Sequence, residues 1–367
     1  MKKILFLIDS LKAIGGAEQM FIDQANYFAE KGIEVHAAGV LAGRSNHFSI
    51  NLSKKVHFTE LNFRSTFDIR EYFKLAKYLR KNDIKTVYSF LDFSNVVARL
   101  SKLFYPNARM VIIEPGNPLR RKNATLFFEG VLNFLVFKIF AISDDVRDKL
   151  VLKFPFHKKK IISVRNGVPA MLSDKEIEEK LSRPKGEFFE ILHVGNMKTE
   201  NKGHEGIIRV ISKIHKDRKD IKARLFLAGG GAMRSELEKL VAAEGLKDSV
   251  VFLGAVLHEE VEKYYFNADV FIFNSRSEGG AAVIMEAASA ALPVVTSDFN
   301  SANEVVKDNE TGFIVRRDDI GEFAAQIEKL YDDSALRVRM GRNARKLYTE
   351  RFTFEVWTDF FIKELFS

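Results

Sequence analysis

Short apolar runs alternate with amphipathic segments along nearly the whole chain. The runs Lys2–Ile8 and Val35–Val40 flank the helical pattern Ala17–Lys31, which makes one strand–helix–strand unit. The alternation restarts at Phe188–Val194, after the polar and charged segment 171–186. A pattern of this kind predicts parallel sheets covered by helices. We therefore expect an α/β protein built from two doubly wound, Rossmann-like domains.

The length of 367 residues agrees with two domains, because one ordinary domain is shorter. We expect an N-terminal domain over 1–170, a linker over 171–186 and a C-terminal domain over 187–352. An aromatic-rich closing helix is expected within 353–367.

Several kinds of chemistry are disfavoured by what the sequence lacks. With no cysteine, the chain has no disulfide framework, thiolate metal site or cysteine nucleophile. It contains no D-x-D pair for a Mg²⁺-bound diphosphate and no zinc-binding histidine spacing. We expect no metal and no cofactor. The apolar run Ile4–Ile8 is too short for a signal peptide, and no run reaches the roughly 18 apolar residues of a membrane span.

Positive charge is concentrated in the first half of the chain. Residues 1–170 contain 28 Lys and Arg against 15 Asp and Glu, whereas the rest is slightly acidic. Such a bias favours an anionic partner, either a membrane surface or a nucleic acid. The basic helix Asp68–Lys81, Arg120–Lys122 and Lys158–Lys160 are candidates for contact with anionic lipid. No nucleic-acid-binding pattern accompanies them, so we expect no nucleic-acid partner.

The stretch Phe271–Asp298 is predicted to form a strand, a loop, a helix and a second strand. Glu278 lies in the loop and Glu286 in the helix, on a face that Ala282 and Ser289 share at about 100° per residue. We expect this face to line a cavity. The helix N-terminus favours a diphosphate, whereas a carboxylate there is suited to a sugar hydroxyl.

Other loops between strands and helices also contain glycine or charge. Gly15 and Gly16 open a helix after the first strand, but they do not form the G-x-G-x-x-G fingerprint, and neither does the Gly229–Gly231 run. A nicotinamide oxidoreductase is therefore disfavoured. Lys202 follows a strand and is either a diphosphate ligand or a solvated loop lysine. His193 is interpreted as a buried structural histidine rather than a catalyst.

Taken in order, several motifs resemble those of the family 4 retaining glycosyltransferases, whose architecture is called GT-B. The resemblance runs from Lys2 to about Phe352. It rests on GGAEQM, KIISVRNGVP, GNMKTENKG, LFLAGGGAMRSELEKL, VVFLGAVLHEEVEKYYFNADVFIFNSRSEGG, EAASAALPVV and NEVVKDNETGFIV. It implies two Rossmann-like domains facing a cleft, of which the C-terminal one holds a nucleotide-sugar and the N-terminal one the acceptor. It also implies that the closing helix within 353–367 crosses back onto the first domain.

The resemblance also implies roles for individual residues. Glu278 would contact the transferred sugar, Glu286 the ribose, and Lys202 the diphosphate; Glu278 and Lys202 are thus the expected catalytic residues. The other expected donor-binding residues are Gly15, Gly16, Asn196, Lys198, Gly254, Ala255, Val256, Gly279, Gly280, Ala281, Ala282 and Val283.

The chain departs from the family pattern at several of these positions. Asn196 stands where the family usually has Arg, and Lys198 is a candidate to replace that charge. Gly279-Gly280-Ala281 replaces Gly-Phe-Gly, and Ala291 replaces a common Gly. The usual acceptor-side histidine near Glu114 is missing.

An acceptor loop is implied by a further likeness. The segment Glu114–Pro118 resembles a loop of members that extend lipid-linked oligosaccharides. Glu114, Asn117 and Arg120 are therefore expected on the acceptor side.

The resemblance leads to one main functional hypothesis and one alternative. The chain is expected to be a retaining, metal-independent glycosyltransferase that moves a hexose or N-acetylhexosamine from a nucleoside-diphosphate sugar, with a UDP-sugar favoured. The acceptor would be a hydroxyl of a growing, lipid-linked cell-surface glycan. We expect a cytoplasmic protein, peripheral on the inner face of the cell membrane. The alternative is a non-catalytic GT-B subunit that binds a nucleotide-sugar or a partner glycosyltransferase.

Overall fold

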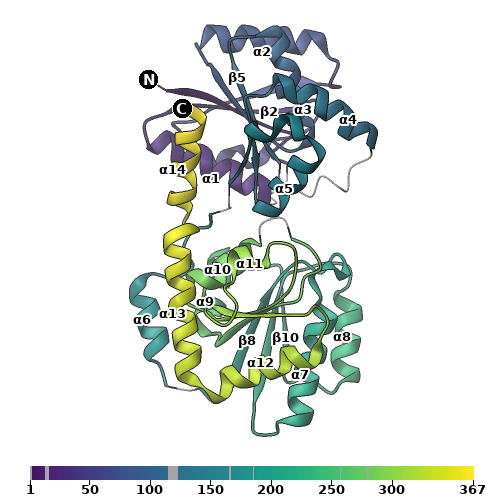
Figure 1. Ribbon diagram of the computed structural model, residues 1–367, viewed down its shortest axis with the longest axis vertical. Helices are drawn as coiled ribbons and strands as arrows, with labels where there is room; N and C mark the ends of the chain where they lie inside the picture. Colours follow the sequence, from purple (N-terminus) through teal and green to yellow (C-terminus); the bar gives the residue numbers. More distant parts are fainter. Residues whose placement is uncertain are drawn as a thin grey trace. The chain divides into compact units, whose positions relative to one another are not determined.

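The computed structural model describes residues 2–12, 16–114, 123–164, 167–184, 186–256, 258–278 and 281–367. The chain forms two compact units, each with a sheet covered by helices (Figure 1). Unit 1 comprises Met1–Arg165 and Trp357–Ser367, and unit 2 comprises Asn166–Val356. All strand pairs of both sheets are parallel. The predicted α/β fold class is confirmed.

Unit 1 contains a seven-stranded sheet with the order β3-β2-β1-β4-β5-β6-β7. Its elements in chain order are β1 (Lys3–Ile8), α1 (Gly16–Glu30), β2 (Glu34–Leu41), η1 (His47–Asn51), β3 (His57–Phe63), α2 (Ile69–Lys81), β4 (Thr86–Phe90), α3 (Asp92–Phe104), β5 (Arg109–Glu114), α4 (Asn123–Leu132), η3 (Asn133–Leu135), β6 (Lys138–Ala141), α5 (Asp144–Lys153), η4 (Pro155–Lys160) and β7 (Ile161–Ser163).

Aromatic side chains fill much of the core of unit 1. Phe6 of β1 packs its ring against four others, with centroid distances of 5.3 to 5.8 Å. The C-terminal helix α14 (Phe354–Phe366) joins this cluster through Phe361, whose ring centroid lies 5.6 Å from Tyr88 and 4.8 Å from Phe140. Buried aromatic pairs stabilise a core beyond the area that they bury. The end of the chain is thereby held on unit 1.

Unit 2 contains a six-stranded sheet with the order β10-β9-β8-β11-β12-β13. Its elements are α6 (Asp174–Ser182), β8 (Phe189–Val194), η5 (Glu200–Lys202), α7 (His204–Asp217), β9 (Ala223–Ala228), α8 (Arg234–Ala243), β10 (Val250–Gly254), α9 (His258–Asn267), β11 (Val270–Phe273), α10 (Ala282–Ser289), β12 (Val294–Ser297), α11 (Ala302–Val305), β13 (Gly312–Val315), α12 (Ile320–Asp332) and α13 (Ser334–Arg351).

Strand β11 shows why its apolar run is buried on both sides. Val270 and Ile272 pack into one hydrophobic cluster, and Phe271 and Phe273 pack into another. Successive side chains of a strand point to opposite faces of the sheet, so a strand covered on both faces needs an unbroken apolar run. The first cluster contains residues of α7, α8 and α12, and the second contains residues of α10 and α13.

The segment 171–186, which the sequence predicts to be a linker, has secondary structure of its own. It contains α6, which begins with a capping box in which Ser173 and Glu176 satisfy each other's backbone N–H groups. Ile177 and Lys180 of this helix are buried, and the Lys180 ammonium donates a hydrogen bond to the backbone oxygen of Tyr265. Contact with α9 therefore holds the segment on unit 2.

Candidate functional site

The strand order of unit 2 reverses between β8 and β11, which are neighbours in the sheet. In open parallel sheets, ligands bind beyond the carboxyl ends of the strands where the order reverses, because the loops there diverge to opposite faces. Lys202 lies in the connection after β8, and Glu278 lies in the loop after β11. The two predicted catalytic residues thus come from the two loops that meet at this point.

A close backbone approach brings these two loops together. Gly203, which follows Lys202, has φ +66°, and a Cβ on it would lie only 2.0 Å from the backbone oxygen of Asn274. Only glycine readily adopts this left-handed conformation and has no Cβ, for which there is no room here. The backbone N–H of Arg276 also donates to the oxygen of Asn201 at 2.8 Å. These contacts fix Lys202 beside the loop that contains Glu278.

Lys202 and Glu278 form an ion pair at the centre of the site. The Lys202 Nζ atom lies 2.7 Å from Glu278 Oε1 and 2.8 Å from Oε2. Both side chains are largely buried, with 19% and 11% exposed. The Ser275 hydroxyl donates to the same carboxylate, and the Asn201 amide donates to the backbone oxygen of Ser277 at 3.1 Å. The pair is therefore held in one geometry rather than left on mobile side chains.

Glu286, on α10, has a hydrogen-bond partner that the sequence alone does not reveal. The hydroxyl of the fully buried Tyr265 donates to Glu286 Oε2 at 2.8 Å. Burial raises the pKa of Tyr265 well above its usual range, so the phenol remains a donor. On the predicted face of α10, Ala282 and Glu286 are partly exposed, whereas Ser289 is fully buried. That this face lines a cavity stays a prediction.

Three glycines of two adjacent loops form a close crossing at the carboxyl edge of β8 and β9. A Cβ on Gly229 would lie 2.1 Å from the oxygen of Gly195, and one on Gly231 would lie 2.2 Å from the backbone carbon of Met197. Gly229 also donates to the oxygen of Gly254 at 2.7 Å. The Gly229–Gly231 run lacks the spacing of the dinucleotide fingerprint, but Gly229 and Gly231 allow the backbones of the two loops to approach closely.

The expected donor-binding residues of unit 2 lie around this crossing. Asn196 and Lys198 are exposed on the loop after β8, with the Lys198 N–H donating to Asn196 Oδ1 at 3.4 Å. Gly254 ends β10, and Ala255 lies next to Gly230. Val256 follows and is partly buried. The structure thus brings five of the predicted residues to one edge of the sheet.

Two alanines occupy backbone conformations that favour glycine. Ala281 has φ +44° at the start of α10, and Ala291 has φ +52° after its end. At both positions the family pattern that the sequence resembles has glycine, where this chain has alanine. The left-handed geometry explains that preference, because a Cβ is strained there. The chain retains the backbone path despite both substitutions. Ala282 and Val283 form the partly exposed first turn of α10.

The remaining predicted site residues lie in unit 1 or outside the described residues. Gly16 begins α1. Glu114 ends β5, is 2% exposed and forms an ion pair with the equally buried Arg99 at 3.2 Å. The Glu114 carboxylate therefore faces the interior of unit 1, and its acceptor-side role stays a prediction. Gly15, Asn117, Arg120, Gly279 and Gly280 lie outside the described residues.

Two histidines pack beside the ion pair. The His193 and His204 rings lie 4.7 Å apart, and burial lowers the pKa of both, that of His204 to about 4. Both rings are therefore neutral near pH 7. His193 contacts the backbone oxygen of Ile272 through Nδ1 at 3.0 Å, which agrees with its interpretation as a buried structural residue.

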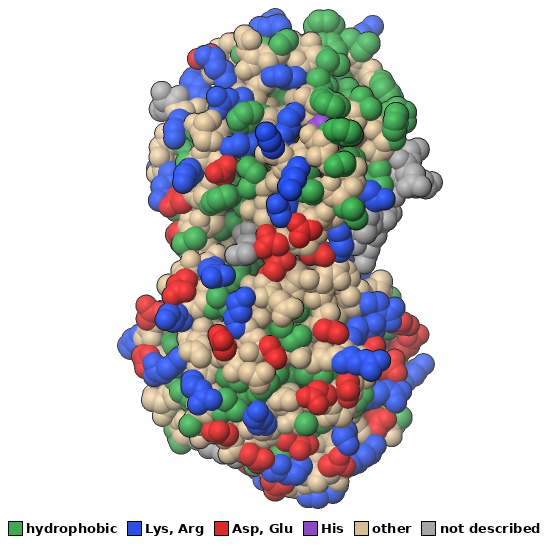
Figure 2. Space-filling view, viewed as in Figure 1, with side chains coloured by type: hydrophobic (Ala, Val, Ile, Leu, Met, Phe, Trp, Pro, Cys, Tyr) green, Lys and Arg blue, Asp and Glu red, His purple; other side chains and the backbone are tan. Residues whose placement is uncertain are grey.

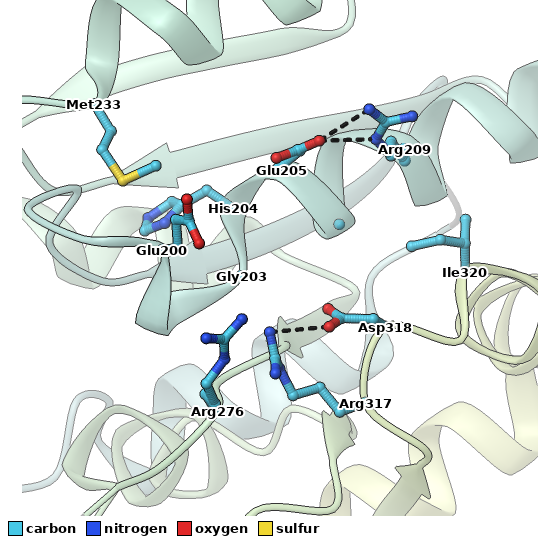
Figure 3. A pocket seen from close by; sticks show the side chains of 11 residues that line it. Glu200, Gly203, His204, Glu205, Arg209, Met233, Arg276, Arg317, Asp318 and Ile320 are labelled. Atoms are coloured by element: carbon cyan, nitrogen blue, oxygen red, sulfur yellow. Dashed lines mark hydrogen bonds and ion pairs between the residues drawn. The ribbon is translucent and has the colours of Figure 1, made fainter.

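A polar pocket of about 300 Å³ adjoins the site, between the start of α7 and the loop after β13 (Figure 3). Three arginines and three carboxylates line it: Glu200, Glu205, Arg209, Arg276, Arg317 and Asp318. Two arginines are already paired, with distances of 2.9 Å for both Arg209–Glu205 and Arg317–Asp318. The pocket therefore presents no strong charge of either sign.

The described ranges contain neither a cluster of metal-binding side chains nor a membrane-spanning helix. No group of three or more His, Cys, Asp or Glu is placed to bind a metal ion among those residues. Within the same part of the chain, no helix is both long and apolar enough to cross a bilayer.

Comparison with known proteins extends these observations to the whole chain. Residues 14–170 match the family model described as Glycosyltransferase Family 4, and residues 173–347 match that of Glycosyl transferases group 1. The chain is 25% identical, over 94% of its length and 93% of the relative, to the GalNAc-α-(1→4)-GalNAc-α-(1→3)-diNAcBac-PP-undecaprenol α-1,4-N-acetyl-D-galactosaminyltransferase of Campylobacter jejuni.

Two other similarities cover a part of the chain and the fold. The α-D-kanosaminyltransferase of Streptomyces kanamyceticus is 32% identical over 44% of this chain and 42% of its own length. The crystal structure of Anabaena HepE in complex with UDP matches with a TM-score of 0.83 at 18% identity, covering 100% of this chain and 99% of that one. Because family models match both halves and the fold agrees along the full length, the chain belongs to the family 4 (group 1) glycosyltransferases of GT-B architecture.

Proposed function

We propose that this chain is a retaining glycosyltransferase that uses a UDP-sugar as its donor. The observation that carries the proposal is the Lys202–Glu278 ion pair, fixed at the point where the strand order of unit 2 reverses. Transfer from a nucleoside diphosphate requires a cation for the departing diphosphate and a polar group for the sugar. The pair supplies one of each.

Each residue of the site has a distinct proposed role. The Lys202 ammonium and the N-terminus of α10 bind the diphosphate, because both carry positive charge. Glu278 accepts hydrogen bonds from hydroxyls of the transferred sugar. Glu286 is oriented by Tyr265 and accepts a hydrogen bond from the ribose. Lys202 has to shift part of its bonding from Glu278 to the diphosphate when the donor binds.

The proposed reaction breaks the bond between the anomeric carbon and the diphosphate oxygen. The diphosphate leaves with the electron pair, and an acceptor hydroxyl forms the new bond on the same face of the sugar. The acceptor proton passes to the departing diphosphate oxygen. Negative charge develops on this oxygen in the transition state, close to the Lys202 ammonium. Lys202 therefore stabilises the transition state more than it stabilises the bound donor. We propose that no metal takes part.

The acceptor is proposed to be a hydroxyl of a growing lipid-linked cell-surface glycan, bound by unit 1. The Campylobacter relative supports this class, since its name describes an enzyme that acts on an undecaprenol-linked glycan. The donor sugar is proposed to be a hexose or N-acetylhexosamine, and the site of action the cytoplasmic face of the membrane. The UDP in the HepE complex supports the choice of nucleotide.

A non-catalytic nucleotide-sugar-binding subunit is the second candidate. Asn196 favours it, because this exposed neutral residue stands where the family pattern has an arginine that would bind the leaving group. Turnover by the purified chain alone eliminates this candidate.

Nucleotide binding tests the donor assignment. We expect UDP at about 100 times its Kd to stabilise the purified chain by about 2.7 kcal/mol, because a ligand bound only to the folded state shifts unfolding by mass action. GDP, ADP and CMP at the same concentration serve as controls in the thermal-shift measurement. The shift should persist in EDTA. No shift with UDP, or a larger one with GDP or ADP, would contradict a UDP-sugar donor.

A further inference from the structure

Exposed apolar side chains are unevenly distributed between the two units. Among the described residues, twelve of the fourteen exposed large hydrophobic side chains belong to unit 1. Single exposed hydrophobic residues are ordinary, but a contiguous group on one face marks an interaction surface. Figure 2 shows hydrophobic side chains gathered along one side of unit 1, with Lys and Arg beside them.

Five of these side chains form a group that we call the α4–η4 face. They are exposed by 53% to 91% and comprise Phe127, Phe128, Val131, Phe134 and Phe156. Phe127, Val131 and Phe134 are spaced i, i+4 and i+7, which places them on one side of α4 and the following turn η3. The Phe127 and Phe128 rings lie 6.0 Å apart.

Contacts of His157 join η4 to the same surface. Its Nε2 atom lies 2.9 Å from the backbone oxygen of Gly130, and its ring centroid lies 4.6 Å from that of Phe134. Phe156, the neighbour of His157 in the chain, therefore extends the surface formed by α4. The five side chains therefore lie on α4, η3 and η4, which pack against one another through His157.

Exposed positive charge, without an ion-pair partner among the described residues, borders this face. Lys153, Lys158 and Lys159 are exposed, and no described carboxylate lies within ion-pair distance of any of them. Residues 123–164 contain seven Lys and Arg against four Asp and Glu. Lys160 does not contribute to this face, contrary to the sequence-based expectation, because its ammonium donates to the backbone oxygens of Asn133, Phe134 and Val136.

We propose that the α4–η4 face docks on an anionic lipid bilayer, with its aromatic side chains among the acyl chains and its lysines at the headgroups. The aromatic side chains suit the acyl-chain layer of a bilayer, and the lysines suit its anionic headgroups. A purely apolar partner would leave the lysines without an opposite charge. The proposal goes beyond the proposed transfer reaction, which does not require it. It explains how the chain would reach a lipid-linked acceptor, since α4 directly follows the expected acceptor loop in sequence.

The test is cosedimentation of the full chain with large unilamellar vesicles, without any nucleotide-sugar. We expect binding to an equal mixture of phosphatidylglycerol and phosphatidylcholine and little binding to phosphatidylcholine alone. Salt should weaken this binding without abolishing it, because only the lysine part is screened. Binding that disappears completely in high salt would contradict insertion of the aromatic side chains.

Two variants separate the contributions of the face. Lys158→Gln with Lys159→Gln should lower the partition coefficient roughly tenfold or more at low salt. Its matched control, Lys239→Gln with Lys247→Gln, removes the same charge from unit 2 and should have little effect. Phe128→Ser, Phe134→Ser and Phe156→Ser combined should remove the salt-resistant part, whereas Phe360→Ser, on α14, should not.

Three outcomes would overturn the docking proposal. In the first, the control variants lose as much binding as the test variants. In the second, both test variants bind vesicles as the wild type does. In the third, sedimentation velocity shows a dimer that only the aromatic variant abolishes. The last would assign the face to a second copy of the chain. Transfer to a water-soluble glycoside acceptor should remain unchanged in every variant. If the wild type binds vesicles but transfers no sugar, the proposed reaction fails and the docking proposal stands.

Discussion

Glu278→Gln should lower kcat by about a hundredfold or more, because it replaces the charged acceptor of hydrogen bonds from the transferred sugar with a neutral amide. Glutamine has almost the same shape and can still accept a hydrogen bond from Ser275. The free energy of unfolding should therefore change by less than about 2 kcal/mol. Initial rates at saturating donor, together with thermal melts, measure the two effects separately.

The control for this variant is Glu200→Gln, which removes an exposed carboxylate from the nearby turn η5. It should retain wild-type kcat, because Glu200 is not paired with Lys202. Near-normal turnover of Glu278→Gln would eliminate the role assigned to Glu278. Equal loss in both variants would show that a general change of charge, rather than this carboxylate, causes the effect.

Lys202→Met should lower kcat/KM for the donor by about a hundredfold to a thousandfold, since loss of one preorganised charge at a leaving group has an effect of this size. Methionine keeps much of the apolar stem that lies beside Gly195, and it removes the ammonium, which lies 5.4 Å from the centroid of the Phe273 ring. The variant should also lose most of the stabilisation by UDP, measured as a thermal shift. Lys239→Met, on the exposed surface of α8, is the matched control.

The double variant Glu278→Gln with Lys202→Met distinguishes two explanations. If the residues act on different parts of the donor, their effects on the activation free energy should be nearly additive. If each acts only by holding the other, the double variant should be about as active as either single variant. Full non-additivity with unchanged UDP binding would contradict direct contact between Lys202 and the diphosphate.

The fold was predictable because its signal is local. Strands such as Val270–Phe273 are short apolar runs, and a parallel sheet buried on both faces requires them. The helix within the segment 171–186 was not predicted, because its high charge leaves only a few apolar residues to mark the helical pattern. A signal was present: Ser173 and Glu176 have the spacing of a capping box, which marks the start of a helix.

The candidate site was only partly predictable, because its contacts depend on strand order. Lys202 and Glu278 are separated by 76 residues, and they meet because β8 and β11 are neighbours in the sheet. The local sequence around each residue does not indicate that these two strands are neighbours. The Tyr265–Glu286 bond and the crossing of Gly229 with Gly195 have the same origin. Residue types indicated candidates, but tertiary structure determined which of them meet.

Transfer by the purified chain, with the anomeric configuration of the product determined by NMR, tests the central claim most directly. The reaction would contain UDP-sugars of the hexose and N-acetylhexosamine classes, a polyprenyl-diphosphate-linked glycan and EDTA. The proposed same-face attack predicts a new linkage with the α configuration of the donor and release of UDP. A β-linked product, or no transfer by a folded chain that binds UDP, would contradict a retaining, metal-independent glycosyltransferase.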